Sequence, residues 1–318
     1  KYNNLIKIYN MSNKYALLIG ITYPNTSAAL PGCDNDVCEI YKFLSKRGFT
    51  NFDVLCDTNI FDEFDIPVKN PVASNIIHSF FKLLLWCRSN PTGTVFLHYS
   101  GHGAQVADNN WVFDSTNKIW KTEEEDGKDE CMVTQDLNYI SDDKLKWLFT
   151  QLPPTITLFS LMDSCHSGTS FDLKYYLKNI NQSVTETNKE ETGANVVMIS
   201  GCKDEQYAES YKFGDKWYGV MSYSFLYLMD YMNKYNIEEV TLGSLWYNMG
   251  IVCNNFPQIP QSSSSRNNFS TCKIKCTSNL FDIVDSTPTV SRGLSTTRSI
   301  SNSNNNNNKT KKWGMKFN

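Results

Sequence analysis

Short, almost continuous apolar runs recur along this chain, and the first of them covers residues 15–21 (YALLIGI). Such runs are typical of parallel strands that are covered on both faces, because neither face needs polar side chains. Further runs of this kind lie at 52–56, 94–99, 155–162 and 195–200. A last candidate strand, 258–264, contains a proline, which favours a position at the edge of the sheet.

The segments between these runs have apolar residues spaced as on one face of a helix. In 33–46, for example, Val37, Ile40 and Leu44 share a face, and Gly48 supplies a stop. Similar patterns cover 73–87, 142–149 (with Ser141 as N-cap), 223–234 and 242–254. Strands that alternate with helices predict an α/β fold, in which a central, mostly parallel β-sheet is flanked by helices on both faces.

Several polar segments lack either period. Residues 104–139 form a polar stretch with acidic clusters and little periodicity. We expect a loop at 174–194 and a poorly ordered leader at 1–13. Residues 286–318 are rich in Ser, Thr and Asn and carry six basic residues without an acid, so we expect a disordered basic tail.

Composition narrows the classes of protein that fit. The net charge of −3 argues against nucleic acid as the main partner. The 10 cysteines are scattered and no secretory signal precedes them, which favours a reducing, cytoplasmic location with free thiols. No apolar run approaches the roughly 20 residues that span a bilayer, so we expect no membrane partner.

Two of the predicted strands end in sequences that carry chemistry. The strand at 94–99 runs into HYSGHG, and the strand at 155–162 runs into DSCHSG. The carboxyl ends of parallel strands lie at one edge of the sheet, where open α/β sheets place their sites. Cys165 and His102 can therefore meet there as nucleophile and base. The alternative for Cys165 is a buried, inert thiol.

The other histidines nearby fit the role of base less well. His98 lies inside a strand run and should be packed, while His166 adjoins the thiol and should point away from it. The backbone N–H groups of Gly103 and Cys165 are candidates for an oxyanion hole.

These two segments resemble the catalytic halves of metacaspases, the calcium-dependent cysteine proteases of the caspase-like clan. Further segments resemble the family in the same order: LPGCDNDV at 30–37, EEDGKDE at 124–130, ISDDKL at 140–145, SGCKDEQYAES at 200–210, YGVMSYSFL at 218–226 and FPQIPQSSSS at 256–265. The resemblance implies a caspase-like catalytic domain over 14–285. Its larger p20-like part would cover 14–173, and a p10-like part at 195–285 would follow the loop.

The resemblance also implies cleavage after arginine or lysine. The residues that match the family's S1 pocket are Cys33, Asp36, Ser100 and Asp163. Two carboxylates would attract a cationic side chain and repel an acidic one. A protease of this specificity would also cut itself, and the candidate sites in the loop are Lys174, Lys178 and Lys189.

A calcium site is the other implication of the resemblance. Calcium prefers several oxygen ligands, often carboxylates. The matching residues are Asp142, Asp143 and Asp172, with Asp126 as the fourth ligand and Asp129 as its alternative. Without the resemblance, these acids would be interpreted as a helix cap and solvated surface charge.

The sequence thus predicts a calcium-activated, self-processing cysteine endopeptidase with a Cys–His dyad, which acts on protein or peptide substrates as a monomer. One alternative is a non-catalytic caspase-like scaffold or regulatory protein. Another is a protease that prefers aspartate at P1, which would require a basic pocket.

Overall fold

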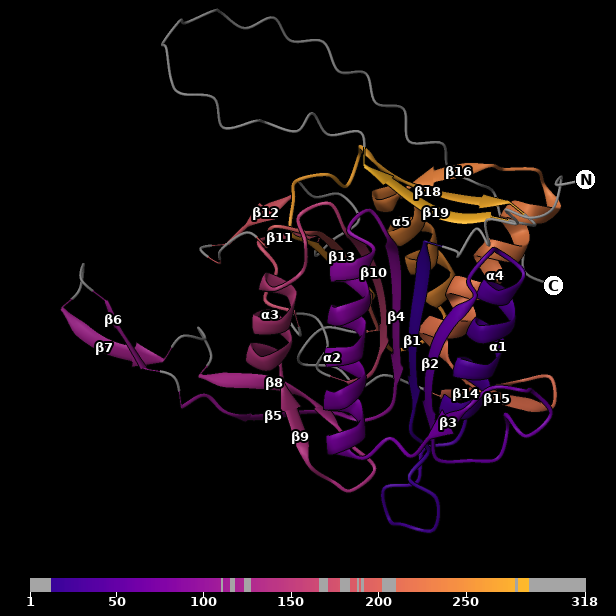
Figure 1. Cartoon of the computed structure of the whole chain (residues 1–318), viewed down its shortest axis with the longest axis horizontal. Helices are drawn as coiled ribbons and strands as arrows, with labels where there is room; N and C mark the ends of the chain where they lie inside the picture. Colours follow the sequence, from indigo (N-terminus) through magenta and orange to yellow (C-terminus); the bar gives the residue numbers. More distant parts are fainter. Residues whose placement is uncertain are drawn as a thin grey trace, which may run out of the picture.

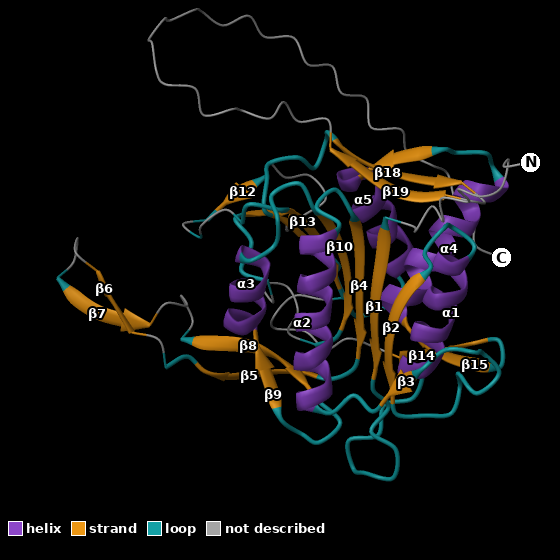
Figure 2. Ribbon diagram, in the orientation of Figure 1, coloured by secondary structure: helices purple, strands orange, loops and turns teal. Residues whose placement is uncertain are grey.

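The computed structural model describes residues 13–109, 111–114, 118–122, 127–165, 171–177, 184–187, 189, 192–201, 210–277 and 280–285. Its central element is a nine-stranded sheet in the order β12-β11-β17-β13-β10-β4-β1-β2-β3 (Figures 1 and 2). The strands of this sheet are β1 (Lys14–Gly20), β2 (Asn51–Cys56), β3 (Val68–Lys69), β4 (Thr94–Ser100), β10 (Thr157–Asp163), β11 (Tyr175–Leu177), β12 (Thr185–Glu186), β13 (Asn195–Ser200) and β17 (Gln261–Ser264).

The strands from β3 to β13 are parallel, while β17, β11 and β12 extend one edge in antiparallel pairing. Every residue of β4 is buried, as the continuous apolar run predicts for a strand covered on both faces. The register pairs Gly20 with Ser100 and Ser100 with Asp163. The carboxyl ends of β1, β4 and β10 therefore lie side by side, at the bottom of the sheet in Figure 1.

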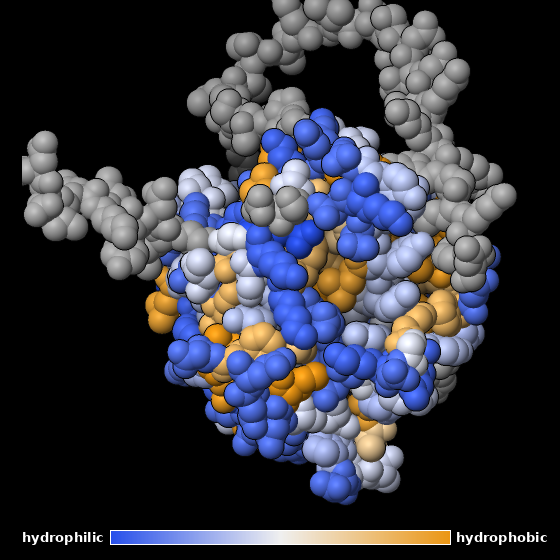
Figure 3. Space-filling model, turned by 90° about the vertical axis from the view of Figure 1, so that its right-hand side faces the viewer, coloured by the Kyte–Doolittle hydropathy of each residue, from blue (hydrophilic) through white to orange (hydrophobic). Residues whose placement is uncertain are grey.

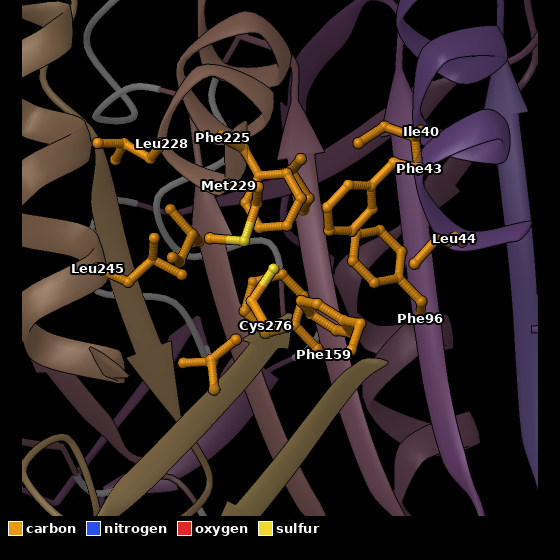
Figure 4. Packing of buried hydrophobic residues seen from close by; sticks show 14 of the residues in the cluster. Ile40, Phe43, Leu44, Phe96, Phe159, Phe225, Leu228, Met229, Leu245 and Cys276 are labelled. Atoms are coloured by element: carbon orange, nitrogen blue, oxygen red, sulfur yellow. The ribbon is translucent and has the colours of Figure 1, made fainter. Parts of the chain in front are cut away.

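Helices cover both faces of the sheet, as expected. On one face lie α1 (Cys33–Ser45), α4 (Val220–Lys234) and α5 (Leu242–Cys253), and on the other lie α2 (Ala73–Ser89) and α3 (Asp142–Thr150). The core on the first face is aromatic: Phe96 and Phe159 project from β4 and β10 toward Phe43, Phe225 and Met229 of the helices (Figure 4). Burial of these large apolar surfaces is what holds the helices on the sheet.

Four smaller sheets surround the central one. They comprise β5 (Gly103–Ala107), β8 (Lys128–Val133) and β9 (Tyr139–Ser141); β6 (Trp111–Asp114) and β7 (Ile119–Thr122); β14 (Ser210–Phe213) and β15 (Lys216–Gly219); and β16 (Glu239–Thr241), β18 (Cys272–Thr277) and β19 (Leu280–Asp285). The expectation of a loop at 174–194 was therefore wrong, since β11 and β12 lie there, and the polar stretch 104–139 contains or overlaps strands β5 to β9, which the sequence did not predict. Strands such as β5 and β12 are largely solvent-accessible and carry no apolar run, so periodicity does not reveal them.

The strand expected at the sheet edge lies inside the sheet. β17 pairs with both β13 and β11, and all four of its residues are buried although they are polar. Pro260 precedes the paired residues, so it removes no donor from the ladder. The hydroxyl of Ser262 donates to the carbonyl of Met198, so this buried side chain is satisfied within the sheet.

Figure 3 shows the surface of the molecule on the side where α1 and α4 lie. This face is mainly hydrophilic, with small hydrophobic areas between polar ones (Figure 3). Within the described part of the chain, none of the helices has the length and apolar character needed to cross a membrane. None of the nine cysteines in that part forms a disulfide.

Candidate active site

A cavity of about 310 Å³ opens where the carboxyl ends of β4 and β10 meet. It is lined by Leu30, Cys33, Ser100, Gly101, His102, Gly103, Asp163, Cys165, Ser210 and Gly219. The structure thus brings together the thiol and the imidazole that the sequence singled out, together with three of the four residues proposed for S1. The aligned strand ends explain this convergence, because residues that follow β4 and β10 must emerge at the same edge.

Cys165 lies two residues beyond β10, in close contact with the start of β5. A Cβ atom on Gly103 would lie 1.8 Å from the carbonyl oxygen of Cys165, so only glycine permits this approach. The N–H of Val133 donates to the carbonyl of His102, which makes residue 102 a hydrogen-bonded position of the β5–β8 ladder. Gly103 is then a non-hydrogen-bonded position, and its N–H points away from β8.

His102 is fixed through both its ring and its backbone. Nε2 lies 2.7 Å from the carbonyl oxygen of Ala28. Because a carbonyl oxygen can only accept, Nε2 carries a proton and Nδ1 is the nitrogen left to act as a base. The ring also packs against that of Tyr23, at 4.7 Å between centroids.

Two tyrosine hydroxyls hold the backbone of this histidine. The hydroxyl of Tyr23 accepts a hydrogen bond from the His102 N–H at 3.0 Å and donates to the carbonyl of Val133. The hydroxyl of Tyr99 donates to the His102 carbonyl at 2.6 Å. These bonds pre-set the position of the imidazole before a substrate arrives.

The candidate S1 acids come from two different elements. Asp36, in the first turn of α1, is fully buried behind the cavity wall. It accepts hydrogen bonds from the hydroxyl of Ser100 at 2.7 Å and from the N–H of Gly219. Asp36 therefore supports two lining residues, Ser100 and Gly219, and does not itself line the cavity.

Asp163 is the last residue of β10, and it does line the cavity. Its Oδ2 accepts hydrogen bonds from the N–H and the hydroxyl of Ser222, each at 2.8 Å. Ser222 lies in the first turn of α4, so the carboxylate also receives the positive end of that helix dipole.

The surroundings of both carboxyl groups disfavour their charged forms. Burial, together with the charge of Asp163, raises the pKa of Asp36 well above its usual value. Burial also raises the pKa of Asp163 to about 6, against the hydrogen bonds from Ser222. A cation that enters the cavity would favour the charged forms of both groups, so the pair suits a cationic ligand.

A second group of acids lies at the start of α3. Oxygens of Asp129, Asp142 and Asp143 lie within 4.8 Å of one another, a set of hard oxygen donors of the kind that calcium binds. Burial raises the pKa of Asp142 to about 9, and the negative charges of Asp172, Glu130 and Asp143 add to this shift. The donor set therefore fits a divalent cation. Of the two candidates for the fourth ligand, Asp129, the alternative to Asp126, lies beside Asp142 and Asp143.

Asp172 is close enough to Asp142 to affect its pKa, but its own carboxylate is engaged by lysines. Lys146 of α3 lies 3.1 Å from Oδ2, and Lys189 lies 2.8 Å from Oδ1. Lys174 forms an ion pair with Glu186 at 3.2 Å. Two further candidates, Asp126 and Lys178, lie outside the described residues.

Sequence reasoning did not find several residues of this site. The carbonyl of Ala28 and the tyrosines act through their position in space, and their sequence context gives no chemical signal. Ser222 lies in the YGVMSYSFL segment that resembles the family, but the sequence did not indicate that it donates hydrogen bonds to Asp163. His98 has the structural place expected of it, fully buried with Nδ1 2.9 Å from the Leu161 carbonyl.

Comparison with known proteins identifies the family. A model described as "Metacaspase, peptidase C14 domain" matches residues 14–174, half of the chain. The chain therefore belongs to the metacaspase family of cysteine-type peptidases, and the expectation of a caspase-like α/β fold is confirmed.

Individual relatives agree with this assignment. Metacaspase-1 of Eremothecium gossypii is 37% identical over 168 residues, which cover 51% of this chain and 34% of that protein. Metacaspase-7 of Arabidopsis thaliana is 40% identical over 162 residues, which cover 50% and 36%. Metacaspase-2 of Trypanosoma brucei brucei is 32% identical over 213 residues, which cover 62% and 56%. The match thus spans only about a third to a little over half of these relatives' own length.

One solved structure supports the fold, and a second one is reported beside it for comparison. The protein GSU0716 from Geobacter sulfurreducens superposes with a TM-score of 0.50 at 18% identity, covering 79% of this chain and 92% of that one. Caspase-1 from Spodoptera frugiperda gives a TM-score of 0.48 at 10% identity, covering 86% and 93%.

Proposed function

We propose that this protein is a cysteine endopeptidase that cleaves peptide bonds after arginine or lysine. The observation that carries the proposal is the single cavity that contains Cys165, His102 and Asp163. A thiol and an imidazole supply the nucleophile and the proton carrier of acyl transfer. The carboxylate of Asp163 in the same cavity supplies a binding site for a cationic side chain, and Asp36 supports that site from behind Ser100 and Gly219.

The reaction follows from these positions. The thiol of Cys165 gives its proton to His102, and the thiolate that forms attacks the scissile carbonyl carbon. The N–H groups of Gly103 and Cys165 donate to the oxyanion that forms. His102 then protonates the leaving amine, the C–N bond breaks, and water hydrolyses the thioester to regenerate the thiol.

Calcium control is part of the proposal. Asp129, Asp142 and Asp143 would hold the ion, with Asp172 from the segment that follows the nucleophile. Bound calcium would supply the positive charge that lets these carboxylates lie together, which favours one arrangement of that segment. Self-cleavage after Lys174, Lys178 or Lys189, action as a monomer and a cytoplasmic location complete the proposal.

Fluorogenic peptides with Arg, Lys or Asp at P1, assayed with and without calcium, test the proposal. We expect turnover of the Arg and Lys peptides in calcium only, and no turnover of the Asp peptide. Turnover of the Asp peptide alone would overturn the pocket assignment, and no turnover of any peptide would favour a non-catalytic scaffold. A Cys165→Ala protein should be inactive and should remain uncut, since persistent cutting would indicate a contaminating protease.

A further inference from the structure

Asp172 has an unusual environment for a carboxylate that a metal ion should bind. It is only 3% exposed, and each of its two oxygens lies against a different ammonium group, that of Lys189 on Oδ1 and that of Lys146 on Oδ2. The side chains of the two lysines are themselves mostly buried, 18% and 19% exposed. Partly buried ion pairs of this kind are screened far less than surface pairs, so they neutralise Asp172 effectively.

The two lysines come from different parts of the chain. Lys146 lies four residues after Asp142, so both side chains are on the same face of α3. Lys189 lies between β12 and β13, in the segment that connects the two halves of the catalytic domain. Asp172 thus links α3 to that segment through two ion pairs.

Calcium and these lysines require the same carboxylate. An ammonium group on each oxygen occupies lone pairs that a metal ion would use. An ammonium group beside bound calcium would also be repelled by the charge of the ion. One carboxylate cannot satisfy both kinds of cation at full strength.

We propose that Lys146 and Lys189 are internal counter-cations of Asp172, and that calcium must displace them in order to bind this carboxylate. The inference rests on the proposed calcium control and deepens it. Calcium affinity then depends on how tightly the lysines hold Asp172. Calcium binding also releases Lys189, which lies in the segment that joins the two halves, from its ion pair with Asp172.

The consequence for self-cleavage differs between the two described candidates. Lys189 is held by a buried carboxylate, whereas Lys174 pairs with Glu186, whose side chain is 60% exposed. A pair with one exposed partner is screened by solvent more than the ion pair at Asp172. Lys189 therefore becomes available as a P1 residue only after calcium has taken Asp172, which would couple its cleavage to the calcium signal.

The first test measures calcium binding calorimetrically in the Cys165→Ala protein, in which no self-cleavage can occur. Lys146→Gln and Lys189→Gln should each tighten calcium binding by about fivefold or more, the lower end of typical coupling between two ligands. Lys144→Gln is the matched control, because it removes the same charge from an exposed position on the same helix. Lys144→Gln should change the affinity by less than about twofold, since exposed charges are screened.

The second test needs no substitution at the lysines. Brief acetylation of the Cys165→Ala protein, followed by mass spectrometry, reports the accessibility of each ammonium group. Calcium should raise the labelling of Lys146 and Lys189 severalfold and leave that of Lys144 unchanged.

The outcomes separate the two proposals. If the parent protein binds calcium but neither substitution tightens binding beyond the Lys144→Gln control, or labelling is unaffected by calcium, the displacement is wrong and calcium control stands. If the parent protein binds no calcium, the displacement and the calcium control are both wrong. Peptidase activity against the Arg peptide is measured separately on the protein with Cys165, so its result bears on the proposed reaction alone.

Discussion

Two groups of buried carboxylates in this molecule are stabilised by opposite means. Asp36 and Asp163 receive hydrogen bonds from uncharged groups, namely two serines and the backbone of Gly219 and Ser222. Asp172 is instead held by two ammonium groups. Uncharged donors orient a carboxylate and leave its charge for a ligand, whereas lysines orient it and cancel that charge.

Under the proposed function, this difference separates a site for substrate recognition from a site for calcium control. In the proposed function, Asp163 meets the substrate cation directly in the cavity, and Asp36 adds its charge from behind Ser100 and Gly219. In the group of acids around α3, Asp172 is already paired with Lys146 and Lys189, so a calcium ion has to compete with these lysines for it. The predictions below test this contrast, first by removing charge from each group in turn.

The largest effect is expected from Asp163→Asn. The amide oxygen can still accept both hydrogen bonds from Ser222, so the local geometry is kept while the charge is lost. Loss of a buried charge partner costs roughly 3 kcal/mol, which lowers kcat/KM for the P1 Arg peptide by about a hundredfold. Steady-state kinetics measures this loss.

A control reaction separates recognition from chemistry in that variant. The rate at which iodoacetamide alkylates Cys165 should be unchanged in Asp163→Asn, because this small reagent does not use the acidic pair. A similar fall in alkylation and in peptide turnover would show that Asp163 supports the nucleophile and does not select the substrate.

Removal of charge at α3 should have a smaller, calcium-dependent effect. Asp143→Asn deletes one of three carboxylates and should weaken calcium binding roughly tenfold or more, because affinity follows the number of charged ligands. Peptidase activity should return to the unsubstituted level when calcium is raised in proportion. A loss of activity that excess calcium does not restore would contradict the separation into recognition and control.

The sequence contained most of the information about where the chemistry lies, and the reason is topological. Cys165 and His102 follow two buried strands, and neighbouring parallel strands deliver their carboxyl ends to one place. The apolar runs sufficed to find those strands. The strand that contains β17 was predicted, but its position at the sheet edge was wrong, because its polar residues and its proline do not reveal the partners on both sides that lie far away in the chain.

Contacts within the site were less predictable. Asp36 was expected to line the pocket, but the Ser100 hydroxyl and the Gly219 N–H cover it. Nor does sequence spacing show that Lys189 contacts Asp172, because the contact depends on the path of the segment between β12 and β13. Such details require a three-dimensional arrangement of side chains, which periodicity and spacing do not encode.

The carboxyl group of Asp163 also predicts a pH dependence of substrate binding. Burial raises the pKa of Asp163 to about 6, so this carboxyl group is charged above that pH and neutral below it. Affinity for a cationic P1 side chain should therefore be full near neutral pH and be lost as the pH falls through 6. Between pH 7 and pH 5 we expect roughly a tenfold weakening.

The inhibition constant of a competitive inhibitor with arginine at P1 measures this effect on binding, and it does not include the pH dependence of the catalytic step at Cys165 and His102. The inhibition constant is compared between the parent protein and Asp163→Asn over the same pH range. The weakening below pH 6 should be absent in Asp163→Asn. If both proteins show it equally, another group is responsible.

The smallest expected effect concerns the hydrogen bonds that position the imidazole of His102. Unlike the two groups of carboxylates, this side chain binds no cation, so the loss of one such bond should affect only its position. Tyr23→Phe keeps the ring that packs against His102 and removes the hydroxyl that accepts from its N–H. The loss of about 1 kcal/mol in positioning should lower kcat about fivefold and leave KM and calcium binding unchanged. Tyr41→Phe, in an aromatic group remote from the cavity lining, is the matched control and should be neutral. A rise in KM, or equal effects of both substitutions, would show that the Tyr23 hydroxyl does not act through the histidine.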